Sequence, residues 1–108
     1  MVIIKFEAPQ VEEYCDLRVS AGMSPKSIEA ARKGLPHACF NITIYDNESL
    51  IAMGRVIGDG GTVFQIVDIA VDKGYQGRGY GRIIMEEIMT YIENVAEKGT
   101  YVSLMADY

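Results

Sequence analysis

The sequence predicts a mixed α/β (α+β) domain in which a mainly antiparallel sheet is flanked by helices. Two short turns, at residues 46–48 and 58–61, join three consecutive segments with strand-like composition. A β-branched segment, Ile66–Val71, then leads through a glycine-rich loop into an amphipathic helix. The expected elements follow the order β-α-α-β-β-β-α-β, so antiparallel hairpins are combined with one crossover helix.

The N-terminal third predicts one strand followed by two helices. Val2–Glu7 has the apolar character of a short strand. A first helix is expected over residues 9–22, because proline is favoured in the first turn of a helix and glycine often follows its end. A second helix is expected over residues 24–34, with Ser24 as its N-cap and Pro25 as its first helical residue.

The rest of the chain predicts three strands, a long helix and a last strand. The three strands are His37–Tyr45, Leu50–Ile57 and Thr62–Val71. Apolar residues at helical spacing mark the inner face of the helix that follows: Ile84, Ile88, Ile92 and Val95, with Met85 and Met89 beside them. After the stop signal Lys98-Gly99, Tyr101–Met105 is the expected fifth strand.

The composition indicates one folded domain over residues 1–108. Of these residues, 49% are hydrophobic and 23% are charged, which argues against disorder. The formal net charge of −5 argues against a nucleic-acid or anionic-membrane binder, because such proteins carry basic patches. An acidic surface suits a cationic amine ligand, although most acidic proteins are simply soluble ones.

The two cysteines indicate neither a metal site nor a disulfide framework. Cys15 and Cys39 form no CxxC pair, and no set of His and Cys has metal-binding spacing. Cys15 is predicted to be buried, because it shares an apolar helical stripe with Val11, Tyr14 and Val19. The N-terminal apolar segment is too short for a signal peptide, and no apolar run has membrane-spanning length, so we expect a cytoplasmic protein.

A glycine-rich loop between the third of these strands and the long helix has the features of an anion site. Gly77, Gly79 and Gly81 let the backbone approach a bulky anion, and main-chain N–H groups at a helix N-terminus attract phosphate. Arg78 and Arg82 add positive charge beside it. The alternative is that the glycines only make a tight strand-to-helix connection. Neither a P-loop nor a dinucleotide-binding turn fits the spacing.

Residues 76–81 fit the pattern Gln/Arg-x-x-Gly-x-Gly, and they follow the segment Asp68-Ile69-Ala70-Val71. This combination closely resembles the acetyl-CoA-binding core of the GNAT superfamily of N-acetyltransferases, and a looser similarity extends along the whole chain. The resemblance implies that the edge of Ile69, Ala70 and Val71 pairs with the pantetheine amides of acetyl-CoA. It also implies that the cofactor pyrophosphate is held by the main-chain N–H groups of Gln76, Gly77, Arg78, Gly79, Tyr80 and Gly81.

The resemblance implies an N-acetyltransferase that transfers an acetyl group from acetyl-CoA to the primary amine of an unidentified acceptor, by direct attack in a ternary complex. The alternative is a CoA-binding or interaction module of the same fold without turnover, and a weaker alternative is another kind of nucleotide binder. Family domains usually continue with a helix and two strands, so the resemblance implies a domain that is truncated after the fifth strand. Such a chain is a cut-off piece of a longer domain, a naturally shortened member, or a chain completed by a partner. That helix often carries a tyrosine that protonates the leaving thiolate, and Tyr108 does not match its position.

Asp68 is the candidate general base, because it is a carboxylate in an otherwise apolar strand beside the expected cofactor. The alternative is a structural carboxylate that is hydrogen-bonded to a neighbouring strand or to Arg55. His37, the only histidine, is interpreted as an ordinary surface or capping residue in preference to a base. By resemblance, the N–H group of Ile69 or Val71, next to a strand bulge, faces the thioester carbonyl. No metal is expected.

The expected acceptor site and the expected partner lie in other parts of the chain. By resemblance, residues 20–24 form one wall of the acceptor pocket, while Tyr45 and residues 59–61 line the rest. The strand Tyr101–Met105, without a further neighbour, exposes unpaired main-chain groups at a sheet edge. We therefore expect a homo-oligomer formed through that edge, an amine acceptor, and no nucleic-acid or membrane partner.

Overall fold

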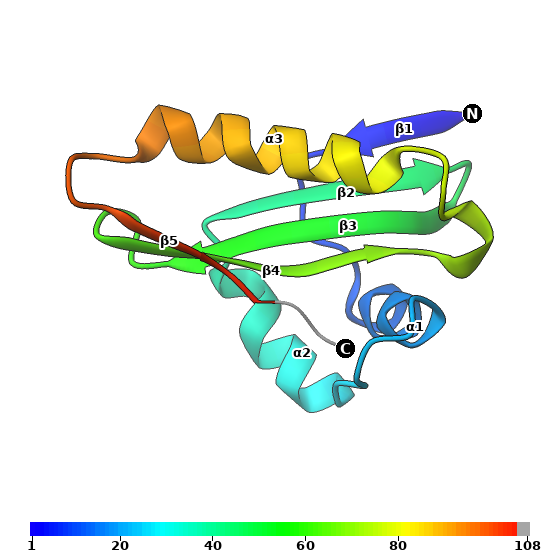
Figure 1. Cartoon of the computed structure of the whole chain (residues 1–108). Coiled ribbons are helices and arrows are strands. Elements are labelled where there is room, and N and C mark those ends of the chain that lie inside the picture. Colours follow the sequence, from blue (N-terminus) through cyan, green and yellow to red (C-terminus); the bar gives the residue numbers. More distant parts are fainter. Residues whose placement is uncertain (106–108) are drawn as a thin grey trace.

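The computed structural model describes residues 1–105 of the chain, which form a five-stranded sheet between two layers of helices (Figure 1). The strands lie in the order β1-β2-β3-β4-β5, and all neighbours are antiparallel except β4 and β5, which are parallel. This arrangement confirms the mixed, mainly antiparallel α/β fold that the sequence predicts. The strands are β1 (Val2–Lys5), β2 (Phe40–Asp46), β3 (Ser49–Gly58), β4 (Val63–Val71) and β5 (Tyr101–Leu104).

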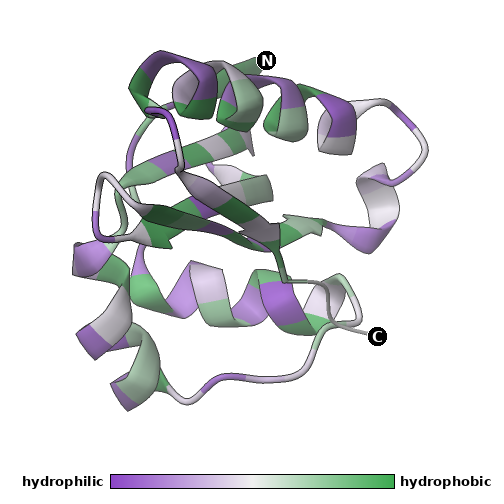
Figure 2. Ribbon diagram, turned by 60° about the vertical axis from the view of Figure 1, so that its left-hand side comes forward, coloured by the Kyte–Doolittle hydropathy of each residue, from purple (hydrophilic) through white to green (hydrophobic). Residues whose placement is uncertain are grey.

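Helices cover both faces of the sheet. On one face, α3 (Tyr80–Val95) makes the crossover between the parallel strands β4 and β5, and on the other lie α1 (Val11–Ser20) and α2 (Ile28–Gly34) (Figure 1). Short 3-10 helices occupy Leu35–His37 and Lys73–Tyr75. Figure 2 shows the mostly apolar strands lying between α3 on one side and α1 and α2 on the other.

Each face of the sheet has its own apolar core. The core under α3 joins the inner residues of that helix to strand residues, and it contains the buried side chains of Ile42, Ile44, Ile51, Val56, Phe64, Ile66, Ile84, Ile88 and Ile92. The core under α1 and α2 is smaller and contains Tyr14, Leu17, Ala31, Leu35, Leu50, Met53 and Ala70. The helical spacing of Ile84, Ile88 and Ile92 in the sequence is therefore the spacing of a core-facing stripe, as predicted.

The predicted N-cap of the second helix is wrong. Oγ of Ser27 accepts a hydrogen bond from the N–H group of Ala30 (3.0 Å), so α2 begins at Ile28. Ser24 lies in the loop before it, where the guanidinium group of Arg18 binds its carbonyl oxygen and its hydroxyl. The other predicted helices and strands are present, although their ends differ by a few residues.

One member of the predicted stripe on α1 is also misplaced. Val19 is 62% exposed, whereas Tyr14, Leu17 and Arg18 are buried against the sheet. Cys15 lies at the side of this face and is half-buried, and burial raises the pKa of its thiol. The buried stripe is therefore rotated toward a charged residue, Arg18, which an apolar pattern does not reveal.

A bulge in β4 interrupts its pairing with β3. The register shifts between Met53 and Arg55, so that two residues of β4, Asp68 and Ile69, stand opposite Gly54 alone. Asp68 has a φ angle of 59°, which is uncommon for a residue other than glycine. The bulge that the family resemblance implies before the glycine loop is therefore present.

The bulge reverses the alternation of side chains along β4. Phe64 and Ile66 pack into the core under α3, and strict alternation would place Asp68 there as well. Instead, Asp68 lies on the α1 face of the sheet, while Ile69 and Val71 pack against the core under α3. A single inserted residue thus places a carboxylate on the α1 face and keeps the apolar residues beyond it inside.

β5 has only one neighbouring strand among the described residues. It pairs with β4, and several of its side chains are open to solvent, with Tyr101 77% exposed and Leu104 57% exposed. This exposed edge agrees with the expected one, and association through it stays a prediction. None of the helices within residues 1–105 has both the length and the apolar character that crossing a membrane requires.

Candidate functional site

The strands β4 and β5 diverge beyond their paired residues (Figure 1). A groove lies where they part. The two strands pair from Val63 to Ile66, and the last main-chain hydrogen bond between them joins the N–H of Met105 to the carbonyl of Ile66 at 2.9 Å. Beyond the bulge, β4 continues without pairing to β5. The resulting groove has a volume of about 430 Å³ and is lined by Ala21, Met23, Ile69, Ala70, Val71, Gln76, Met85, Leu104 and Met105.

Main-chain polar groups of β4 face this groove. The N–H of Asp72 donates to the carbonyl of Ile51 in β3 (2.7 Å), so by alternation the N–H and C=O groups of Ile69 and Val71 point to the opposite edge. One of these groups has a partner, because the carbonyl of Val71 accepts from Nε2 of Gln76 at 3.0 Å. The groove therefore offers apolar walls with an open strand edge on one side, which suits an elongated ligand that contains amide groups.

The glycine-rich loop lies at one end of the groove and leads into α3. Gly77 and Gly79 have φ angles of 81° and 88°, which favour glycine, and Gly79 is the N-cap of α3. None of the main-chain N–H groups of residues 76–82 donates a hydrogen bond to another residue in the described part of the chain. The positive φ angles are what either interpretation of the loop expects, a tight connection or an anion site. The row of available N–H groups at a helix N-terminus favours the anion site.

Two arginines lie in and just after this loop. The guanidinium group of Arg78 lies over the ring of Tyr75, 5.1 Å from its centre, and Arg82 is exposed in the first turn of α3. The hydroxyl of Tyr75 donates to Oδ2 of Asp46 (2.7 Å), which lowers the pKa of Asp46 and raises that of Tyr75. These contacts hold Tyr75, and with it Arg78, beside the loop.

The groove and the loop together suit the chemistry of coenzyme A. The available N–H groups of residues 76–82 suit a diphosphate, and the apolar groove with its strand edge suits a pantetheine arm. The predicted cofactor residues Ile69, Ala70, Val71 and Gln76 line the groove, and residues 77–81 form the loop at its end and the start of α3. The structure brings them together, and their role in binding stays a prediction.

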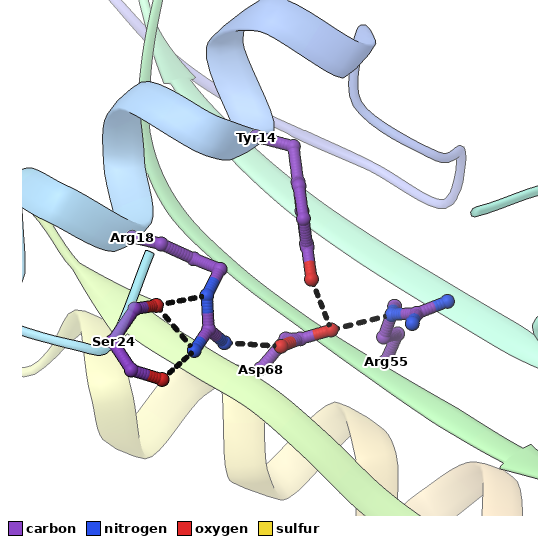
Figure 3. Close-up of polar contacts among 5 residues, drawn as sticks. All are labelled: Tyr14, Arg18, Ser24, Arg55 and Asp68. Carbon is purple, nitrogen blue, oxygen red and sulfur yellow. Dashed lines mark hydrogen bonds and ion pairs between the residues drawn. The ribbon is translucent and has the colours of Figure 1, made fainter. Parts of the chain in front are cut away.

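Asp68 is the centre of a buried cluster of charged residues on the other face of β4 (Figure 3). Its Oδ1 accepts from Nη1 of Arg18 (2.5 Å), and its Oδ2 accepts from Nε of Arg55 (2.6 Å) and from the hydroxyl of Tyr14 (2.9 Å). Asp68 is 7% exposed, so these bonds lie out of bulk water, where they are stronger. Burial, followed by the neighbouring Asp68, raises the pKa of Tyr14 to about 12.

Arg18 extends this cluster to the loop between α1 and α2. Its Nε and Nη2 donate to the carbonyl of Ser24 at 2.9 and 2.7 Å, and Nη2 also donates to the Ser24 hydroxyl at 3.0 Å (Figure 3). The sequence left open that Asp68 is a structural carboxylate bonded to Arg55, and this bond is present. The role of Asp68 as a base stays a prediction, and its bonds to two guanidinium groups favour the structural role.

Tyr14 and Arg18, which bind Asp68, were not among the predicted site residues. Their one sequence signal is their spacing of four, which places both on the same face of α1. An arginine on the inner face of a helix needs a buried partner, and Asp68 was the only carboxylate in the apolar part of β4.

A second pocket, of about 350 Å³, opens over this charged cluster. It is lined by Tyr14, Arg18, Met23, Ser24, Lys26, Arg55, Ile57, Val67, Asp68 and Met105. Met23 and Met105 also line the groove, so the two cavities adjoin there. We call the second cavity the α1-side pocket.

The expected acceptor walls agree with this pocket only in part. Met23 and Ser24, from the segment 20–24, line the α1-side pocket. Tyr45 and residues 59–61 are not part of its lining. The hydroxyl of Tyr45 binds the side chain of Glu13, and the Asp59 side chain is bonded within its own turn. His37 is exposed and lines neither the groove nor the α1-side pocket. Within residues 1–105, no group of His, Cys, Asp and Glu could hold a metal ion.

Comparisons with known proteins identify the fold and the family. Residues 7–106 match the model of the acetyltransferase (GNAT) family. Among solved structures, a probable acetyltransferase of unknown function from meticillin-resistant Staphylococcus aureus is 64% identical over 100% of this chain and 81% of its own, with a TM-score of 0.95. A GNAT family acetyltransferase from Streptococcus pneumoniae is 26% identical over 99% of this chain and 76% of its own, with a TM-score of 0.75.

More distant structures share the fold. The ribosomal-protein-S18-alanine N-acetyltransferase from Escherichia coli is 21% identical over 87% of this chain and 61% of its own, with a TM-score of 0.70. No curated protein matches the sequence. The split between β4 and β5, the glycine loop before α3 and the match over residues 7–106 agree with one another, and the chain therefore belongs to the acetyltransferase (GNAT) family.

Proposed function

We propose that this chain is an acetyl-CoA-dependent N-acetyltransferase, which transfers an acetyl group to the primary amine of an acceptor by direct attack in a ternary complex. The observation that carries the proposal is the groove between β4 and β5, which ends at a loop whose N–H groups from residue 76 to residue 82 have no partner in the described chain. The second, adjoining pocket supplies a separate place for an acceptor, as a ternary complex requires.

Acetyl-CoA, when bound, supplies an already activated thioester, so no nucleophilic side chain is needed. The N–H groups of residues 76–82 hold the diphosphate, and the edge of Ile69 and Val71 orients the pantetheine arm. In this proposal, the N–H group of Ile69 or Val71 donates to the oxyanion. One such well-aimed donor typically contributes about 3 kcal/mol of transition-state stabilisation.

The acceptor amine must lose a proton before it attacks. Asp68 is the candidate base within reach of the α1-side pocket, and a base in the right place contributes roughly a factor of 100 or more. Tyr14 stays protonated at neutral pH, because its pKa is raised to about 12, and it therefore acts as a donor that positions Asp68. Water can carry the proton from the amine where direct contact is not made.

The proposal is tested by titrating the protein with acetyl-CoA in a calorimeter and by following thiol release with a panel of amines. Binding in the micromolar range together with amine-dependent release of CoA supports the transferase. The second candidate is a CoA-binding module without turnover, and it is favoured by the engagement of both Asp68 oxygens in ion pairs. Binding without thiol release from any amine selects that candidate, and absence of binding rejects both. The expected cytoplasmic location stays a prediction.

A further inference from the structure

The side chain of Arg78 is held by its flat face and not by its N–H groups. Its guanidinium group lies 5.1 Å from the centre of the Tyr75 ring, within the range of a cation–π contact. No hydrogen bond or ion pair joins the Arg78 side chain to another residue in the described part of the chain. The donors of a guanidinium group point outward in its plane, so stacking on a ring leaves them available for the oxygens of an anion.

Tyr75, on which Arg78 lies, is anchored to two other elements. Its hydroxyl donates to Oδ2 of Asp46 at 2.7 Å, and Asp46 is the last residue of β2, 29 residues away along the chain. The ring of Tyr80, the first residue of α3, lies edge-on to the Tyr75 ring, with centres 6.2 Å apart. Contacts from β2 and from α3 therefore fix the ring that supports the guanidinium group.

The charges around Tyr75 favour the stacked position of Arg78. The hydrogen bond from Tyr75 lowers the pKa of Asp46. The amino group of Met1, 3.4 Å from Oδ1, and the charge of Arg78 lower it further, so Asp46 is ionised at neutral pH. A phenol that donates to a carboxylate gains electron density in its ring, and a more negative ring attracts a guanidinium group more strongly.

The place of Arg78 in the chain connects this contact to the glycine loop. Arg78 lies between Gly77 and Gly79, so its side chain starts within the row of available main-chain N–H groups. An arginine that moves freely in solvent loses rotamer freedom when it binds a ligand, and one that is already held loses less. A guanidinium group positioned in this way therefore binds a phosphate more tightly than a free one.

We propose that Tyr75 and Asp46 are positioning residues, which hold the guanidinium group of Arg78 beside the glycine loop so that its N–H groups bind a phosphate of the cofactor. The inference rests on the proposed function, in which the main-chain N–H groups of residues 76–82 hold the diphosphate. Coenzyme A offers phosphate oxygens in its diphosphate and in the 3′-phosphate of its ribose. The alternative is that the contacts of Tyr75 only stabilise the turn at Lys73–Tyr75.

The first test compares CoA, 3′-dephospho-CoA and pantetheine by calorimetric titration of the unchanged protein and of Arg78→Gln. We expect Arg78→Gln to bind CoA about tenfold more weakly, and to bind pantetheine, which has no phosphate, as well as the unchanged protein does. An equal loss for CoA and dephospho-CoA assigns Arg78 to the diphosphate, and a loss for CoA alone assigns it to the 3′-phosphate. Unchanged affinity for all three, or an equal loss for pantetheine, overturns the inference.

The second test is a double-mutant cycle that separates positioning from stabilisation of the turn. Tyr75→Leu should weaken CoA binding about fivefold in the unchanged protein, but by less than about twofold in Arg78→Gln, where no guanidinium group is left to hold. Arg82→Gln removes the same charge from the first turn of α3, and in that background Tyr75→Leu should keep its full effect. A loss that is equal in all three backgrounds means that Tyr75 acts through the turn, and it overturns the inference.

Tyr75→Phe is the conservative variant for the same cycle. It keeps the ring under Arg78 and loses only the hydrogen bond to Asp46, so it should retain most of the affinity, with a loss of about twofold. Circular dichroism establishes that each variant is folded. If Tyr75→Leu does not fold, the cycle of Tyr75→Phe with Arg78→Gln carries the decision.

Asp46 is tested in a second background, because removing a carboxylate also removes its repulsion of a bound phosphate. That general effect is the same with and without the Tyr75 hydroxyl, whereas positioning needs the hydroxyl. The ratio of CoA affinity with Asp46→Ala to that without it should therefore be about twofold lower in the unchanged protein than in Tyr75→Phe. Equal ratios in the two backgrounds overturn the role of Asp46.

These measurements also separate failure of this inference from failure of the proposed function. If the unchanged protein binds neither CoA nor dephospho-CoA, both are overturned. If it binds them and the variants of Arg78 and Tyr75 bind them equally well, the main-chain diphosphate site stands and only the positioning role fails. Binding decides both outcomes, so the acceptor does not have to be known.

Discussion

A Cβ atom at Gly54 would lie 2.5 Å from Cγ2 of Ile84, closer than side chains approach one another. Gly54 therefore lets α3 pack directly onto β3 opposite the bulge. We expect Gly54→Ala to lower the free energy of unfolding by about 1–3 kcal/mol, as overpacking does in well-packed cores. Urea denaturation measures the change, and Gly61→Ala is the control, because a Cβ atom there meets nothing within 4 Å. Equal stability of the two variants would show that α3 sits farther from the sheet.

The glycine loop is tested by two valine substitutions at matched backbone conformation. Gly79 and Gly60 have φ angles of 88° and 87°, and a Cβ atom at either meets nothing within 4 Å. Both Gly79→Val and Gly60→Val should therefore cost similar stability. Only Gly79→Val should lose CoA affinity, by at least about tenfold, because its side chain enters the path of the diphosphate. Calorimetric titration with CoA checks this, and unchanged affinity in Gly79→Val places the diphosphate elsewhere.

The buried ion pairs of Asp68 predict a large loss of stability on neutralisation. Asp68→Asn leaves Arg18 and Arg55 without their shared counter-charge, and breaking such a buried pair typically costs about 3–5 kcal/mol. Asp16→Asn, at an exposed position of α1, is the matched control and should cost less than about 0.5 kcal/mol. Chemical denaturation of both variants gives the comparison. A loss below about 1 kcal/mol in Asp68→Asn would mean that the cluster is not structural, and would strengthen its assignment as the base.

Tyr14 predicts a pH dependence of stability in the alkaline range. Its pKa is raised from 10.0 to about 12 in the folded chain, so between these values the unfolded chain releases a proton that the folded chain keeps. The contribution is fully present below about pH 10, and it is lost as the pH rises toward 12, by at most about 1.4 kcal/mol per pH unit. Unfolding in urea at pH 9, 10 and 11 should show this decline, and Tyr14→Phe should show a shallower one. If the free energy of unfolding fell equally with pH in the unchanged protein and in Tyr14→Phe, the raised pKa of Tyr14 would be contradicted.

The exposed edge of β5 predicts association. We expect an apparent mass above that of a monomer in size-exclusion chromatography, since an unpaired strand edge is a template for pairing. Tyr101→Lys places a charge on that edge and should shift the elution toward the monomer, while Val19→Lys, at a similarly exposed apolar position of α1, should not. A stable monomer at every concentration of the unchanged protein would reject the prediction.

The order of the elements could be read from the sequence because the signals are local. The helical spacing of Ile84, Ile88 and Ile92 lies within one helix, and these residues are buried on one face of it as predicted. The glycines of the loop lie within one short segment and adopt the positive φ angles of a tight turn. The partners of Asp68 could not be read in this way. Arg18 is 50 residues away along the chain, and the two meet only when α1 packs across β4. The bulge at Asp68 adds to the difficulty, because it breaks the period of two on which strand prediction depends.

The shared carboxylate has a consequence for redesign of this enzyme. Through Arg18 and Ser24, Asp68 fixes the loop before α2, and through the main chain of β4 it lies next to the edge that faces the groove. Transplanting that whole loop from a relative would therefore disturb the groove between β4 and β5 as well as the α1-side pocket. Met23 and Lys26 are the sensible starting points for altered selectivity, because both line the α1-side pocket without bonding to Asp68.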